Sequence, residues 1–141
     1  MSEQENGQQN TEQQTQAIPL PLTPETVWKW VSTQLMNDST LQPIVGNKVF
    51  PFTTQEPQKL PWIVVDNIDV SYAEDKDAND ADQATCIVTC AEKTYTKLNT
   101  LSAAVVAAVN MIDGCRVTNR HQSFVDDIGF VEEVSLTIDL Y

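Results

Sequence analysis

The sequence predicts an α+β domain in which a mostly antiparallel sheet carries two main helices on one face. Apolar residues recur at helical spacing over residues 24–37 and 96–113. In several other segments they alternate with polar residues, as in strands with one buried face. The resulting order of helix, strands, helix and strands favours an α+β domain over a parallel α/β one.

The composition divides the chain into an arm and a domain. A chain of 141 residues with 41 % hydrophobic residues can bury one modest core. Residues 1–16 are rich in Gln and Glu and cannot offset the entropy of ordering by burial, and the prolines that follow favour an extended linker. We therefore expect residues 1–22 to be a disordered arm with a Pro-rich linker, and residues 23–141 to be one domain.

Thr23-Pro24 marks the start of the first helix, because threonine is a good N-cap and proline is tolerated at the first helical position. The predicted apolar stripe of this helix consists of Val27, Trp28, Val31 and Leu35. Trp30 lies off that stripe. Its indole ring is either a half-buried aromatic group or a contact between subunits.

Alternation predicts the strands. After a short strand at residues 48–50, a long strand has one apolar face formed by Trp62, Val64, Ile68, Val70 and Tyr72. The next strand, residues 84–92, has a face formed by Ala84, Cys86, Val88 and Cys90. The mixed pattern of residues 115–125 predicts a half-exposed strand. In the last strand, Val134, Leu136, Ile138 and Leu140 are expected to point inward.

The second helix has an apolar stripe and a glycine that ends it. The stripe consists of Leu98, Leu101, Val105, Ala108 and Ile112, and Gly114 follows. The alanines of this segment allow close packing on a sheet.

The stretch EDKDANDAD, residues 74–82, joins two predicted strands and is therefore expected to be the tip of a long acidic β-hairpin. Its opening resembles a calcium loop, but Asp80 occupies the position of the turn glycine and Cys86 that of the closing glutamate. We therefore expect a solvated surface rather than a metal site. Its candidate interaction residues are Glu74, Asp75, Asp77, Asp80 and Asp82.

No cofactor, metal site or catalytic centre is expected. Cys86 and Cys90 would lie about 13 Å apart along one strand, too far to share a zinc ion. The pairs Asp126-Asp127 and Glu132-Glu133 place neighbouring carboxyl groups on opposite faces, whereas general acid–base chemistry needs them to converge. His121, the only histidine, is expected to be a partly exposed strand residue.

The charge excludes some partners. A net charge of −12 and a pI near 4.2 repel phosphate backbones and anionic membranes. The chain has no apolar run of spanning length, and its first residues do not form a secretory signal. The protein is expected to stay in a cytosol after synthesis.

The run MNDSTLQPIVGNKVFPFTTQEPQKLPWIVV resembles the opening of the bacteriophage tail-completion family, which includes tail-to-head joining proteins and is similar to the tail terminators. Members have a short helix, an acid-then-leucine segment, a glycine turn, a brief strand, a proline-bearing loop and a strand introduced by proline and an aromatic residue. The matching positions are Asp38, Leu41, Gly46, Val49-Phe50, Pro57 and Pro61-Trp62. The resemblance extends over residues 24–141.

The resemblance implies a non-enzymatic virion protein that caps the head-proximal end of a phage tail tube and joins it to the head connector. It implies a homo-oligomeric ring, commonly a hexamer, with the tail tube protein and head connector protein as partners. DNA would pass through the ring without specific binding. The implied location is the host cytoplasm during assembly and then the virion tail.

Two other functions remain open at this stage. An acidic protein can act as a DNA mimic that occupies a nucleic-acid-binding protein, although the helix over residues 98–112 contains no acid. A tail-assembly factor that is absent from the finished particle is the other alternative.

Overall fold

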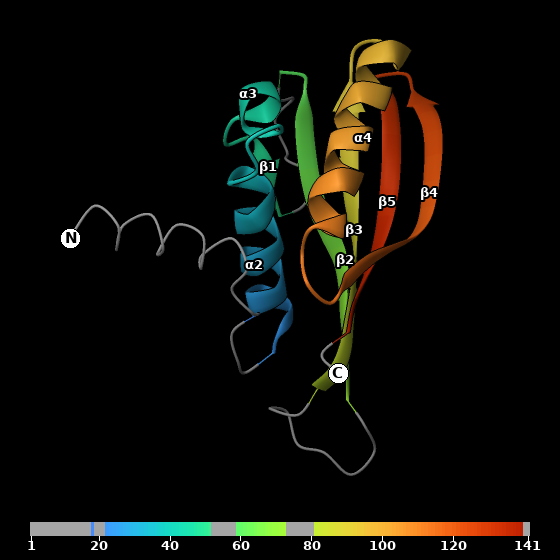
Figure 1. Ribbon diagram of the computed structural model, residues 1–141. Helices are drawn as coiled ribbons and strands as arrows, with labels where there is room; N and C mark the ends of the chain where they lie inside the picture. The colour runs from blue at the N-terminus through green and yellow to red at the C-terminus, as the bar shows by residue number, and fades with distance from the viewer. Residues whose placement is uncertain (1–17, 19–21, 52–58, 73–80, 140–141) are drawn as a thin grey trace, which may run out of the picture.

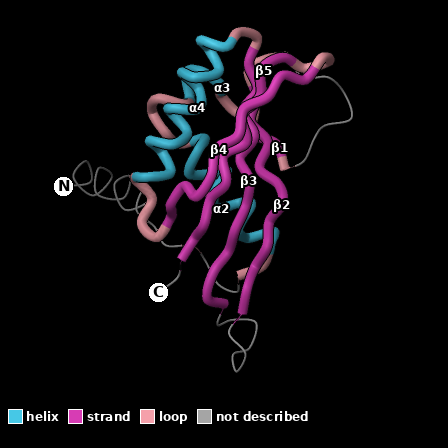
Figure 2. Tube along the Cα trace, turned by 90° about the vertical axis from the view of Figure 1, so that its right-hand side faces the viewer, coloured by secondary structure: helices cyan, strands magenta, loops and turns pink. Residues whose placement is uncertain are grey.

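The computed structural model describes residues 18, 22–51, 59–72 and 81–139 (Figure 1). Helices α2 (Pro24–Met36) and α4 (Tyr95–Asn110) lie on one face of a five-stranded sheet (Figures 1 and 2). The predicted α+β class, with two main helices on one face of a mostly antiparallel sheet, is confirmed. Among the described residues, no helix is long and apolar enough to cross a membrane.

Helix α2 begins where the sequence predicts. The Thr23 side chain accepts a hydrogen bond from the N–H of Thr26 at 3.2 Å, and the Thr26 hydroxyl accepts one from the N–H of Thr23 at 2.8 Å. Leu22 and Val27 occupy the two positions of a hydrophobic staple, and both are fully buried. The core therefore includes Leu22, which the sequence predicts to lie in the linker.

A short helix, α3 (Gln42–Val45), follows α2 and leads into strand β1 (Val49–Phe50). The turn between α2 and α3 is held by Asp38, whose Oδ1 accepts hydrogen bonds from the N–H groups of Thr40 and Leu41. Leu41 is fully buried. This region of weak sequence periodicity is therefore anchored to the core by one leucine.

The sheet has the strand order β1-β2-β3-β5-β4. Strands β2 (Trp62–Tyr72), β3 (Ala81–Glu92), β5 (Gly129–Asp139) and β4 (Cys115–Val125) are antiparallel neighbours, and β1 pairs with β2 in parallel. β1 covers only the first part of β2, at Ile63 and Val64. Strand β4 forms the opposite edge of the sheet.

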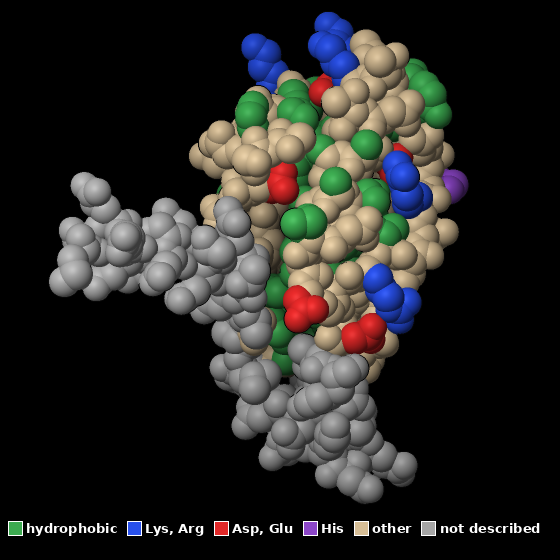
Figure 3. Space-filling model, viewed as in Figure 1, with side chains coloured by type: hydrophobic (Ala, Val, Ile, Leu, Met, Phe, Trp, Pro, Cys, Tyr) green, Lys and Arg blue, Asp and Glu red, His purple; other side chains and the backbone are tan. Residues whose placement is uncertain are grey.

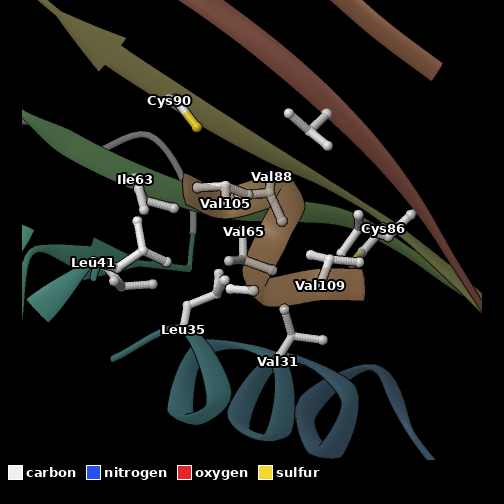
Figure 4. Close-up of a cluster of buried hydrophobic side chains, with 14 of the residues drawn as sticks. Val31, Leu35, Leu41, Ile63, Val65, Cys86, Val88, Cys90, Val105 and Val109 are labelled. Atoms are coloured by element: carbon white, nitrogen blue, oxygen red, sulfur yellow. The ribbon is translucent and has the colours of Figure 1, made fainter. Parts of the chain in front are cut away.

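The core lies between the helices and the sheet. Cys86, Val88 and Cys90 of β3 point towards the helices, as predicted, together with Ile63 and Val65 of β2 (Figure 4). Helix α2 packs against β1 and β2, and α4 packs against β3, β4 and β5. The predicted stripe of α4 is confirmed for Leu98, Leu101, Val105 and Ala108, which are buried, whereas Ile112 lies after the end of the helix at Asn110 and is only partly buried.

The predicted face of β2 is wrong in its first half. Ile63 and Val65, rather than Trp62 and Val64, face the helices, whereas Ile68 and Val70 pack against the core as predicted. The cause is a register shift between Asp66 and Asp69, where Asn67 has a φ of 50°. An irregularity of this kind moves the following side chains to the other face, so simple alternation cannot be followed through it.

Candidate functional site

The acidic stretch joins two strands that pair with each other. Tyr72 at the end of β2 is the partner of Ala81 at the start of β3, so the predicted hairpin arrangement is confirmed. Glu74, Asp75, Asp77 and Asp80 lie outside the described residues. The backbone of Asp82 belongs to β3 rather than to the predicted turn, because the strand begins at Ala81, and its side chain is also outside the description.

The two tryptophans of α2 have the opposite roles to those the sequence indicated. Trp30, interpreted as lying off the apolar stripe, is only 7 % exposed and belongs to the core. Trp28, assigned to the stripe, is half-buried. The reason is that α2 packs against α4 as well as against β1 and β2, which widens its buried face beyond one stripe. Trp30 therefore offers little surface for a subunit contact.

Trp28 lines an open groove of about 500 Å³, which we call the β2 groove. Its lining residues are Pro24, Glu25, Trp28, Pro51, Asn67 and Ile68. The groove lies where β1 has ended and where the β2 irregularity interrupts regular pairing. Sequence reasoning missed it because it depends on the meeting of α2, the residue after β1 and the bulge of β2.

Two polar side-chain atoms in the described part of the chain are buried without a hydrogen-bond partner, one on α2 and one on β2. They are Nε1 of Trp28 and Oδ1 of Asp66. Burial, together with the nearby charge of Glu133, raises the pKa of Asp66. Asp66 was the polar exception in the predicted strand pattern, and it does not line the β2 groove.

A polar network forms between α4, β4 and β5, and we call it the Glu132 network. Arg120 donates through Nε to Glu132 Oε2 at 2.6 Å and through Nη2 to the Ser102 hydroxyl at 3.2 Å. Gln122 donates through Nε2 to Glu132 Oε1 at 2.7 Å and to Asn99 Oδ1 at 2.8 Å. The Glu132 side chain is only 1 % exposed. Two strands and a helix therefore share one buried carboxylate.

This network holds a fixed charge rather than a proton donor. Burial alone would raise the pKa of Glu132, but hydrogen bonds from Arg120, Gln122 and Ser102 outweigh burial and hold that pKa below its ordinary value. A carboxylate kept ionised in this way is unsuited to act as a general acid. The arrangement instead links α4 to β4 and β5 through hydrogen bonds.

The cysteines and the histidine lie on different faces of the sheet. Cys86 and Cys90 point towards the helices, whereas His121 pairs with Glu133, which lies on the other face. Burial is the main cause of the raised thiol pKa values of Cys86 and Cys115, both to about 12, and it also raises the pKa of Cys90. Within the described ranges, no three His, Cys, Asp or Glu side chains form a group that could hold a metal. Glu132 and Glu133 likewise point to opposite faces, as predicted.

Strand β4 is an exposed edge of the sheet, and both of its arginines are ion-paired with acids of β5. Both arginines of the chain, Arg116 and Arg120, lie on it with His121, and it contains no acid. Arg116 donates through Nε to Asp139 at 3.1 Å, and hydrogen bonds from Gln83 and Arg116 lower the pKa of Asp139. On the face drawn in Figure 3, acidic and basic side chains of the described residues are interspersed and form no single-charge patch.

Comparison with known proteins shows one similar fold among solved structures. The chain matches no family model, and no curated protein matches it. A chain from a solved structure described as "Virion of native gene transfer agent (GTA) particle" has a similar fold, with a TM-score of 0.60 and 16 % sequence identity. The match covers 77 % of this chain and 90 % of that chain.

Proposed function

We propose that this protein is a structural component of a phage-like virion, without enzymatic activity. In this role it caps the head-proximal end of a tail tube and joins the tube to the head connector. It acts as a closed homo-oligomeric ring, a hexamer in its commonest form. It assembles in the host cytoplasm and remains in the virion tail.

The observation that carries this proposal is the fold shared with a chain of a gene transfer agent virion. The likeness extends over 90 % of that chain, so it involves a whole fold rather than one common motif. The tail-completion resemblance of residues 24–141 is an independent argument from the sequence, and it points to the same class of particle.

The chemistry of the described residues is compatible with this role. The buried carboxylate of Glu132 is neutralised by Arg120, and the thiols of Cys86 and Cys90 are buried in the core. The accessible features are instead sheet edges and a shallow groove, which suit contacts between proteins. A net charge of −12 also suits a passage through which DNA moves without sticking.

The test is deletion of the gene in the host that produces the particles, followed by electron microscopy. We expect free heads together with tails that are unjoined or of irregular length, and we expect the purified protein to restore joining. Normal tails, normal head joining and full infectivity in the deletion strain would refute the proposal.

A five-residue variant tests the acidic stretch within this function. Changing Glu74, Asp75, Asp77, Asp80 and Asp82 to Gln or Asn should leave the thermal unfolding temperature unchanged, because solvated charges contribute little to stability. Head joining or DNA passage should decline. A variant that joins heads and transfers DNA as well as the wild type would remove the assigned role of these acids.

Mass spectrometry of purified particles separates the proposal from an assembly factor. A virion component is present in every purified particle, whereas an assembly factor is absent although its deletion gives the same defect. A DNA mimic would instead compete with DNA for a nucleic-acid-binding protein in a gel-shift assay, and we expect no such competition.

A further inference from the structure

Three charged residues near the ends of α2 and α4 are placed against the preference of these helices. Lys97 is the third residue of α4, and the first turn of this helix contains no acid. Asp38 and Asp113 follow the ends of α2 and α4, and neither last turn contains a base. Helices favour negative charge at their start and positive charge at their end. Positions that break a local rule are often functional, so the surfaces around these residues are candidates for contacts.

The ends of α2 and α4 border a hollow of about 250 Å³, which we call the helix-end hollow. It is lined by residues 34 and 37–39 from the side of α2 and by Ala108, Met111 and Ile112 from the side of α4. Met111 is 81 % exposed, more than any other large hydrophobic side chain in the described ranges. The lining includes Asp38 and no described base, and Asp113 follows Ile112 in the chain. The hollow therefore offers apolar surface and negative charge together.

An exposed aromatic cluster lies at the opposite end of α4. Tyr95, the first residue of the helix, is 52 % exposed, and Phe124 of β4 is 58 % exposed. The ring of Phe130 joins them, with its centroid 5.9 Å from that of Tyr95 and 5.1 Å from that of Phe124. Val125, the next residue of β4, is 39 % exposed, so three of the four exposed large hydrophobic side chains of the described residues gather here. Exposed clusters of this kind anchor contacts between proteins.

The lysines beside this cluster have no ion pair within the described structure. Lys93 and Lys97 stand two positions before and after Tyr95, and both are exposed. The described bases that form ion pairs are Lys29, Arg116 and Arg120. The described bases without an ion pair are Lys48, Lys59, Lys93 and Lys97.

Lys48 and Lys59 lie at the same end of the molecule as the aromatic cluster. A Cβ at Gly129, at the start of β5, would lie 3.5 Å from the Leu60 side chain and 2.7 Å from the carbonyl oxygen of Glu92. Lys59 directly precedes Leu60, and Lys48 donates through Nζ to the carbonyl group of Lys59 at 3.0 Å. The segment with Lys59 therefore lies beside the segment that leads from Glu92 into α4.

The charge of this end differs from that of the whole chain. The described acids at this end are Asp126 and Asp127, in the turn after β4, and the buried Glu92. Four lysines against three acids leave a net charge of +1, whereas the whole chain carries −12. We call the four lysines, together with Tyr95, Phe124 and Val125, the lysine end. It is a basic surface on an acidic protein, and an acidic surface is its complement.

The lysine end and the helix-end hollow lie at opposite ends of α4 (Figure 1). The helix has 16 residues, so at about 1.5 Å per residue the two surfaces are about 24 Å apart. They share no residue, and one copy can therefore use both at once. A contact between them joins lysines to carboxylates and aromatic rings to the thioether of Met111, which packs favourably on such rings. It also brings the positive start of α4 in one copy to the negative helix ends of another.

We propose that the lysine end of one copy of this chain binds the helix-end hollow of a second copy. In this contact, Met111 packs against the rings of Tyr95 and Phe124, and the lysines lie beside Asp38 and Asp113. The contact is the subunit interface of the ring and rests on the proposed function. It is heterologous, since it joins two different surfaces, and repetition of it around an axis closes a ring.

Two substitutions disable the two surfaces separately. Lys97→Glu reverses a charge of the lysine end, and Met111→Asp removes the apolar contact of the hollow and adds a carboxylate there. We expect each to weaken association of the full-length protein about tenfold or more, measured by native mass spectrometry across a concentration series. Both positions are exposed, and Lys97→Glu places an acid in the first turn of α4, so the thermal unfolding temperature of that variant should be unchanged or higher. Its loss of association would therefore not come from unfolding.

Matched controls are Lys29→Glu and Asn119→Asp, which make the same changes of net charge at exposed positions outside both surfaces. They should associate like the wild type. Circular dichroism verifies that every variant is folded. Wild-type protein that stays monomeric throughout the series, or wild-type association of Lys97→Glu or Met111→Asp, would overturn the interface.

A mixture of the two variants tests whether the contact joins two different surfaces. The Lys97→Glu copy keeps an intact hollow, and the Met111→Asp copy keeps an intact lysine end. An equimolar mixture should therefore form one-to-one pairs with wild-type affinity and no larger species. A mixture that associates as weakly as each variant alone would contradict the heterologous contact.

Cysteine cross-linking tests the contact in assembled particles. Thr96, between Tyr95 and Lys97, is exposed and lies about 22 Å from Met111 along α4, too far for a disulfide within one chain. In a Cys115→Ser background, a chain carrying both Thr96→Cys and Met111→Cys should give a ladder of covalent multimers on a non-reducing gel after oxidation. The control pair Asn119→Cys and Met111→Cys should give no ladder.

The outcomes separate the interface from the function. Particles that contain the chain but yield no ladder would overturn this interface and leave the virion role intact. A ladder from purified protein, together with absence of the chain from particles, would support the interface and overturn the virion role.

Discussion

Arg120 of β4 and Glu132 of β5 form an ion pair at 2.6 Å in which the carboxylate is buried and the guanidinium is 45 % exposed. The pair lies under α4, where Ser102 contacts Arg120. The guanidinium of Arg120 can reach water, whereas the carboxylate of Glu132 cannot. Removal of the arginine therefore leaves a buried negative charge without its charged partner. The consequences for stability can be measured directly.

Arg120→Ala is expected to lower the free energy of unfolding by about 1–3 kcal/mol, because Glu132 loses its charged donor while buried. The measurement is urea unfolding at neutral pH. Lys97→Ala is the matched control, since Lys97 is an exposed basic residue on α4, and its effect should stay within about 0.5 kcal/mol. Equal effects of the two substitutions would show that the Glu132 network does not contribute to stability.

The same network predicts an acid-sensitive part of the stability. The folded-state pKa of Glu132 is lowered below its ordinary value of 4.5, so the unfolded state binds protons more readily. The stability that Glu132 contributes is therefore present above pH 4.5 and is lost as pH falls through the lowered pKa. The free energy of unfolding, measured in urea between about pH 7 and pH 3, should fall less steeply with decreasing pH for Glu132→Gln than for the wild type. Parallel declines of the two proteins would contradict this.

Asn67 has the positive φ of 50° that forms the irregularity in β2. Asn67→Gly should leave stability nearly unchanged, whereas Asn67→Val should cost about 1–2 kcal/mol, since a β-branched residue tolerates this backbone conformation poorly. Thermal unfolding of the two variants checks the difference. The same two substitutions at Asn47, an exposed turn residue, are the control and should not show this preference for glycine over valine. A stable Asn67→Val variant would mean that the bulge is not required.

Two glycines differ in what a side chain would meet. A Cβ at Gly129 would lie 2.7 Å from the carbonyl oxygen of Glu92, whereas a Cβ at Gly46 would meet nothing within 4 Å. Both have positive φ, at 134° and 61°. Gly46→Ala should therefore cost about 1–3 kcal/mol from backbone strain alone, because its φ of 61° and ψ of −122° suit glycine, and Gly129→Ala should cost more, because the carbonyl group of Glu92 must also move. Denaturant midpoints of the two variants provide the comparison, and a smaller loss for Gly129→Ala would refute the close approach.

Several features follow from local sequence alone. The start of α2 depends on Thr23, Pro24 and Thr26, which are adjacent in the chain and satisfy each other's backbone groups. The inward residues Val134, Leu136 and Ile138 of β5 and the stripe of α4 up to Ala108 follow from unbroken periodicity and are confirmed, whereas Leu140 lies outside the described residues. The opposite orientation of Glu132 and Glu133 also follows from alternation along a regular strand.

The candidate sites follow from the sequence only in part. The outlying Asp66 and the gathering of both arginines in one segment are visible in the sequence, but neither indicates which residues lie opposite. The meeting of Arg120 and Gln122 with Glu132 depends on the pairing of β4 with β5, and the β2 groove depends on the register shift between Asp66 and Asp69. No local pattern contains this information.

The sequence by itself determined the class of the fold, the main helices and the inner face of β5, because each depends on residues a few positions apart. Only the tertiary structure decided which face of β2 is buried, which tryptophan of α2 is enclosed, and that Glu132 meets Arg120 and Gln122 beneath α4. These outcomes depend on contacts between distant segments, and a single shift in register exchanges the two faces of a strand. Contacts between distant segments therefore decide which strand face and which helix face is buried, and local periodicity cannot distinguish these alternatives.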